Sequence, residues 1–229
     1  MTDIPGSGLP DTTPASEPRL AASVILLRDA PTGLEAFVQH RVSTMDFAAG
    51  MVVFPGGRVD AVDQSGWDYP DELLQAHAAD WRHTSISADP APAATKAGTV
   101  LAAAIREVQE EAGLSIDAAD LRPWANWITP TDMPKRFDTY FYVAKPAPGA
   151  EPQHQTTEAW QSLWMPVDGI LGAEAAGTLK LMPPTYYLLI EIAALGTVDA
   201  VWSAGHPVVP VLAPVGSLAA FFKERESRR

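Results

Sequence analysis

The stretch REVQEEAGL, from Arg106 to Leu114, determines how the rest of the chain is interpreted. At about 100° per residue, its three glutamates fall within one sector of roughly 100° on a helix. Carboxylates at positions i, i+3 and i+4 repel one another, and these lie at the negative end of the helix dipole. Such an arrangement is costly unless a cation lies among the glutamates. The stretch therefore predicts a divalent-metal site at the end of an amphipathic helix.

The residues that flank this stretch predict where the helix begins and ends. Leu101, Ile105, Val108 and Ala112 cluster on the face next to the acidic sector, so this face packs against a core. Gly113 follows the last apolar position and readily adopts the left-handed conformation that ends helices. We predict a helix over residues 94–112.

Strand-forming and turn-forming segments surround this helix. Residues 19–27 and 34–40 are apolar runs separated by the turn sequence DAPTG, and they predict a β-hairpin. A short strand over 51–54 ends at the sequence PGG. Further strands are predicted over 124–128, 137–143 and 160–164, and helices over 70–83, 167–177 and 184–195. The Pro-rich segment 201–216 predicts edge strands rather than a helix. Residues 1–18 form a mobile tail.

The composition excludes several classes of protein. The chain has 229 residues, a net charge of −12 and no cysteine, with 47% apolar and 19% charged residues. The negative charge argues against a nucleic-acid surface, and the lack of cysteine excludes thiolate metal centres. No apolar run reaches membrane-spanning length, and the N-terminus lacks a signal-peptide pattern. We expect a cytoplasmic enzyme with a small-molecule substrate.

Other interpretations of single residues remain open. Three acids on a helix are more often a solvated face than a metal site, and an arginine beside them is more often a surface ion pair. Trp124, Trp127 and Tyr140 either stack on a substrate base or belong to the core.

Gly57, then Asp63, then Arg106–Leu114 resemble the Nudix box, G-x5-E-x7-R-E-U-x-E-E-x-G-U. The second half matches at all nine positions. In the first half, Asp63 stands in place of the family's glutamate, and 42 residues rather than seven separate it from Arg106. An interrupted box is typical of the subfamily that includes a peroxisomal coenzyme A diphosphatase and bacterial relatives. The resemblance implies an α/β/α sandwich with a mixed β-sheet, as a single domain over residues 19–229 with an insertion at about 64–93.

The resemblance also implies which residues form the site. Glu107, Glu110 and Glu111, with the backbone carbonyl of Gly56, would bind Mg²⁺ or Mn²⁺, which prefer such oxygen ligands. Arg106 would orient a carboxylate, with Asp63 as its partner. Glu111 and Glu158 are the candidates for the general base. The residues expected to contact the substrate are Arg41, Gly57 and Arg136.

The resemblance implies a hydrolase that cleaves the diphosphate of a nucleoside diphosphate linked to another group. Coenzyme A or an acyl-CoA is the preferred substrate, and ADP-ribose or a dinucleotide such as NADH is the nearest alternative. A non-catalytic ligand-binding module is the alternative from another class. The family is often dimeric, so a homodimer stays open. The insertion is predicted to be either a lid or an interface.

Overall fold

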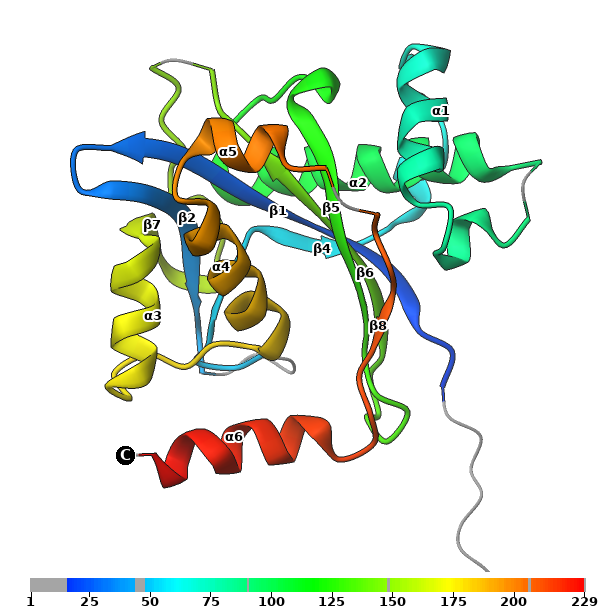
Figure 1. Ribbon diagram of the computed structural model, residues 1–229. Helices are drawn as coiled ribbons and strands as arrows, with labels where there is room; N and C mark the ends of the chain where they lie inside the picture. The colour runs from blue at the N-terminus through cyan, green and yellow to red at the C-terminus, as the bar shows by residue number, and fades with distance from the viewer. Residues whose placement is uncertain (1–15, 44–47, 90, 148, 206, 229) are drawn as a thin grey trace, which may run out of the picture.

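A mixed β-sheet forms the centre of the protein (Figure 1). The computed structural model describes residues 16–43, 48–89, 91–147, 149–205 and 207–228. Within these residues eight strands follow the order β3-β2-β1-β6-β5-β8, while β4 pairs with β1 and β7 pairs with β2. The pairs β1–β6 and β5–β8 are parallel, and the others are antiparallel. The strands are β1 (Arg19–Ala30), β2 (Gly33–Arg41), β3 (Val52–Val53), β4 (Gly56–Arg58), β5 (Leu121–Ile128), β6 (Phe137–Ala144), β7 (Ala159–Pro166) and β8 (Val211–Leu212).

Helices cover both faces of the sheet (Figure 1). Side chains alternate along β6, so that Tyr140 and Tyr142 join the core beneath α2, whereas Phe141 and Val143 join the core beneath α4. The predicted α/β/α sandwich with a mixed sheet is confirmed. The helices are α1 (Asp71–Asp80), α2 (Ala93–Ala112), α3 (Val167–Ala175), α4 (Pro183–Leu195), α5 (Val198–Ser203) and α6 (Ser217–Ser227). Short 3₁₀ turns cover Ala61–Gln64, Ser85–Ser87 and Ala118–Asp120.

Helix α2 carries the acidic stretch and ends as predicted. Gly113 has a left-handed φ of 61°, and its amide donates to the carbonyl of Gln109. The loop after β6 closes the helix end, because the amide of Gln153 donates to the carbonyl of Ala112 at 2.8 Å. This contact fixes the last turn of α2, on which Glu110 and Glu111 lie.

The other predicted elements agree with the structure except at three places. The hairpin, the strands at 124–128, 137–143 and 160–164, and the helices at 70–83, 167–177 and 184–195 are confirmed within a few residues. Gly56 and Gly57, which follow the predicted short strand, form the separate strand β4, because this segment pairs with β1. Residues 201–203 end the helix α5, whereas 211–212 form the predicted edge strand β8. Helix α6 was not predicted, and residues 1–15 of the predicted tail lie outside the described residues.

The insertion packs against α2 and against β6, where the Trp81 ring contacts the rings of Tyr140 and Tyr142. Trp81 is fully buried, and Leu74 is 6% exposed. The ring of Trp67 lies so close to Gly98 that an added Cβ there would be 2.5 Å from it. Within the part of the chain that the structure describes, no helix is long and apolar enough to cross a membrane.

Candidate active site

A cavity of about 1160 Å³ opens beside the last turns of α2. Its wall includes β4, the loop between β5 and β6, the start of α4 and the segment from β8 into α6. Every residue predicted to act in the site lines this one cavity. These residues are Arg41, Gly56, Gly57, Arg106, Glu107, Glu110, Glu111, Arg136 and Glu158.

Arg106 joins α2 to the segment that precedes the insertion. Its Nε and Nη2 donate to the two carboxylate oxygens of Asp63, each at 2.9 Å. Its Nη1 donates to Glu107 Oε1 at 2.8 Å and to Glu110 Oε2 at 3.0 Å. Asp63 is only 3% exposed, so this bidentate pair is largely shielded from water. The predicted partnership of Arg106 with Asp63 is confirmed, although the insertion separates them in the sequence.

Two of the box glutamates are buried. Burial raises the pKa of Glu107, and the neighbouring Arg106 opposes that shift. Burial also raises the pKa of Glu111 to about 7. The hydrogen bond from the Gly56 amide, at 2.8 Å, opposes this shift. The Glu107 and Glu158 carboxylates raise the pKa further. A cation bound beside Glu107 and Glu111 would offset the burial that raises the pKa of both carboxyls.

Gly56 and Gly57 bring the backbone of β4 against other parts of the site. A Cβ at Gly56 would lie 2.4 Å from the carbonyl oxygen of Ala22, in the neighbouring strand. A Cβ at Gly57 would lie 2.4 Å from Oε1 of Glu107. Only glycine lets β4 approach β1 and the carboxylate this closely.

Arg41 and Glu158 meet at the end of the β2–β7 pair. Arg41 Nη2 lies 2.9 Å from Glu158 Oε2, and the Glu158 side chain is 49% exposed. The Glu158 carboxylate raises the pKa of Glu111, and the Arg41 guanidinium lowers it. The candidate general base Glu158 thus lies near the box acids, where an arginine orients it.

Arg136 lies at the rim of the cavity and is 8% exposed. Its Nε donates to the carbonyl of Thr129 at 3.1 Å, and its Nη1 donates to the carbonyl of Ser16 at 2.7 Å. These bonds hold the loop between β5 and β6 against the start of the chain. These two hydrogen bonds of Arg136 were not predicted from the sequence.

Part of the cavity wall was not predicted. Tyr187 and Phe221 line it, on α4 and α6. Of the three aromatic residues considered for base stacking, Trp124 and Tyr140 are buried in the core, whereas Trp127 lines the cavity. None of the described residues of the insertion lines it. The pair Tyr186 and Tyr187, shortly after Pro183, was the available sequence signal for the part of the wall on α4.

The donor set suits a hard divalent cation. Glu107, Glu110, Glu111 and Glu158 present carboxylate oxygens to one cavity, and Mg²⁺ and Mn²⁺ prefer oxygen ligands. In the described ranges, no three acidic or histidine side chains converge closely enough to form a ready-made metal cluster. Arg106 engages Glu107 and Glu110, while the Gly56 amide engages Glu111.

The model of the NUDIX domain matches residues 17–184, so the chain belongs to the Nudix family. This match confirms the predicted family and supports the predicted class, a hydrolase that acts on pyrophosphates. No curated protein matches the chain.

One solved structure shares the fold, and two further ones are less similar. A Nudix hydrolase from Alicyclobacillus acidocaldarius has a TM-score of 0.64 and 24% identity, over 84% of this chain and 98% of that chain. The Nudix domain of Shewanella oneidensis NrtR, in complex with ADP ribose, has a TM-score of 0.49 and 14% identity, over 78% and 88% of the two chains. A MutT Nudix hydrolase from Burkholderia pseudomallei has a TM-score of 0.48 and 17% identity, over 77% and 99%.

Proposed function

We propose that this protein is a Mg²⁺- or Mn²⁺-dependent hydrolase that cleaves the diphosphate of a nucleoside diphosphate linked to another group. The observation that carries the proposal is that the three box glutamates, Glu158 and the three predicted arginines line one cavity. Hydrolases of the Nudix family generally need such a metal. The donor set described above fits this requirement.

Each residue has a distinct part in the proposed reaction. Glu107, Glu110 and Glu111, with the carbonyl of Gly56, would hold the metal. When bound, Mg²⁺ or Mn²⁺ polarises the diphosphate and makes a bound water more acidic. Arg106 keeps Glu107 in place through the hydrogen bond at 2.8 Å.

The remaining residues accept the proton of the water and bind the phosphates. Glu111 or Glu158 accepts the proton of the attacking water. Arg41 and Arg136 carry positive charge at the cavity wall, where the diphosphate needs it, and the absence of a side chain on Gly57 leaves room for the substrate.

Coenzyme A or an acyl-CoA is the preferred substrate. The resemblance to the subfamily with an interrupted box supports this preference. ADP-ribose and NADH are the alternatives within the same reaction class. We also infer one domain over residues 19–229 that contains the insertion, and a homodimer, which light scattering would test.

A panel assay tests the hydrolase and ranks its substrates. The protein is incubated with Mg²⁺ or Mn²⁺ and with coenzyme A, acetyl-CoA, ADP-ribose and NADH, and products are identified by mass spectrometry. We expect two phosphorylated products from at least one compound, in the presence of metal only. Tight binding of a compound without any product would favour the non-catalytic ligand-binding module instead.

A further inference from the structure

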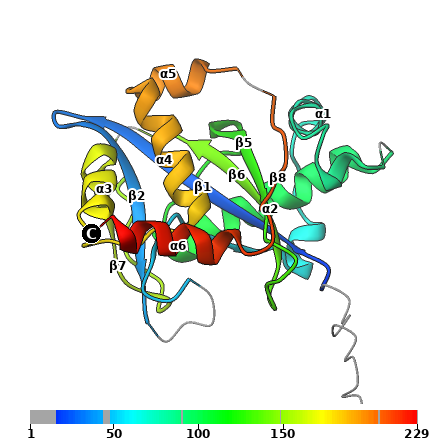
Figure 2. The same cartoon turned by 60° about the horizontal axis from the view of Figure 1, so that its bottom comes forward.

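Part of the cavity wall comes from residues beyond the match to the family model, which ends at residue 184. We call Val211–Ser227, which comprises β8 and α6, the C-terminal arm. In Figure 2 the arm lies along the face of the molecule that carries α4. After residue 184, α4 contributes Tyr187 to the lining, and the arm contributes Phe221 among others.

Three contacts hold the arm in place. β8 pairs with β5, with Val211 opposite Trp127. The amide of Gly216, just before α6, donates to Asp132 Oδ2 at 2.9 Å. Near the other end of α6, Arg225 Nε lies 2.8 Å from Glu174 Oε1, and both side chains are largely buried.

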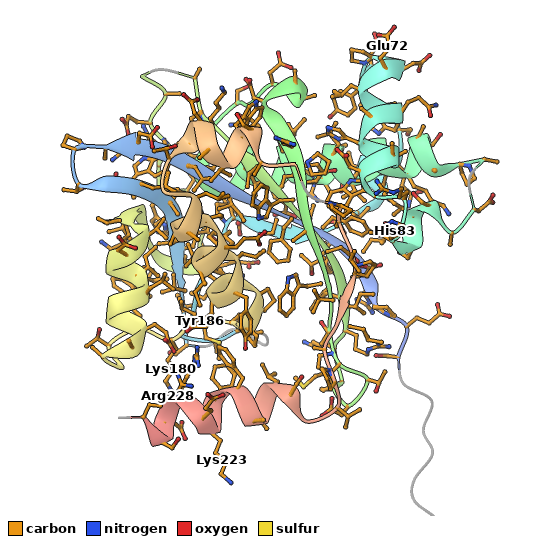
Figure 3. All side chains as sticks on the ribbon, viewed as in Figure 1. Glu72, His83, Lys180, Tyr186, Lys223 and Arg228 are labelled. Carbon is orange, nitrogen blue, oxygen red and sulfur yellow. The ribbon has the colours of Figure 1, made fainter. Side chains whose placement is uncertain are left out.

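The Arg225 guanidinium also covers an aromatic ring of α4. Its Cζ lies 3.7 Å from the centroid of the Tyr186 ring, and Figure 3 shows Tyr186 between α4 and α6. A buried ion pair and a cation–π contact at the same side chain fix the position of α6 relative to the cavity.

Three aromatic residues meet where the arm reaches the cavity. The rings of Trp127 and Tyr187 stack, with centroids 5.9 Å apart and planes inclined by 14°. Phe221 of the arm lies 6.1 Å from Tyr187, and it is buried, whereas Tyr187 is 50% exposed. A half-exposed tyrosine, supported from two sides inside a cavity, leaves ring surface for a ligand.

The size of the cavity leaves room for a large substrate. Typical small-molecule pockets measure about 300–1,000 Å³. The cavity, at about 1160 Å³, is thus large enough for a substrate that extends well beyond its diphosphate. The aromatic surface and the box acids line the same cavity, so one ligand can contact both.

We propose that Trp127, Tyr187 and Phe221 bind an aromatic base of the substrate, so that the C-terminal arm determines which substrates are accepted. This inference rests on the proposed diphosphate hydrolysis, because the base must be joined to the group that is cleaved. Tyr187 supplies the surface that contacts the base. Trp127 stacks on the Tyr187 ring, and Phe221 packs against the same ring from α6. The ion pair between Arg225 and Glu174 positions Phe221.

Ligand binding tests the inference without turnover. Calorimetry compares adenosine monophosphate with ribose 5-phosphate, which lacks the base, on the full chain with Mg²⁺. We expect the wild type to bind adenosine monophosphate at least about fivefold more tightly, since base–aromatic stacking is typically worth that much. Tyr187→Leu and Phe221→Leu should remove this preference and leave ribose 5-phosphate binding unchanged.

Phe222→Leu is the matched control, because Phe222 is the next residue of α6 and lines a different cavity of about 270 Å³. It should retain the preference. Equal affinities of the wild type for the two ligands would overturn the inference, as would a loss in Phe222→Leu as large as in Phe221→Leu. Retention of the preference by Phe221→Leu would also overturn the role of the arm. Failure of the hydrolysis panel alongside intact base binding would count against the proposed hydrolase and not against the aromatic surface.

Discussion

Replacing Gly57 by alanine should inactivate the enzyme without unfolding it. The added Cβ would lie 2.4 Å from Glu107 Oε1 and 2.6 Å from its Cδ. Ordinary contact begins at 3.4 Å, so the carboxylate must move by about 1 Å. Because Glu107 is a flexible side chain, this movement costs little folding free energy. A catalytic group misplaced by about 1 Å can cost on the order of 100-fold in rate.

The assay for this variant measures kcat/KM with Mg²⁺ and the free energy of unfolding in urea. We expect a loss of about 100-fold in kcat/KM with a stability change below about 1 kcal/mol. Gly172→Ala on α3 is the control, because an added Cβ there meets nothing within 4 Å. Gly56→Ala should instead destabilise the fold, since its Cβ would meet the backbone of β1. Wild-type activity in a folded Gly57→Ala variant would refute the proposed role of Glu107.

Further substitutions probe the supports of the site and of the insertion. Asp63→Asn should lower the free energy of unfolding by about 2–3 kcal/mol, because Arg106 loses a shielded bidentate partner, and the exposed Asp68→Asn should change it little. Burial lowers the pKa of His77 to about 4, so stability that is present above about pH 6.5 should fall by up to about 3 kcal/mol as the pH drops to 4. His77→Gln should flatten this part of the stability–pH curve, and an unchanged slope would exclude His77 as its source. Gly98→Ala should displace Trp67 and increase proteolysis within residues 64–93, and unchanged cleavage would contradict the packing described.

The part of the site that the sequence predicted depends on local spacing. Glu107, Glu110 and Glu111 fall on one side of α2 because of helical periodicity alone. The pairing of Asp63 with Arg106 followed from the resemblance to the Nudix box, and the structure has this pair at 2.9 Å. The strands were predictable because apolar runs separated by turn sequences have few other solutions.

The parts that were missed depend on contacts between distant segments. The arm reaches the cavity through Gly216 with Asp132 and through Arg225 with Glu174, and no local pattern encodes these pairs. α6 has only one buried residue, Phe221, so its sequence lacks the apolar stripe that predicts a helix. The role of the insertion was also open, because its tryptophans required burial without indicating where.

The most direct test of the account is the rate of diphosphate hydrolysis by Glu111→Gln with saturating Mg²⁺. Glutamine can still accept the hydrogen bond that the Gly56 amide donates to Glu111, so the fold should persist. Glu72→Gln on the exposed side of α1 is the matched control. The account predicts a loss of at least about 100-fold for Glu111→Gln and an unchanged rate for Glu72→Gln. A wild-type rate in Glu111→Gln would contradict the assignment of the active site to α2.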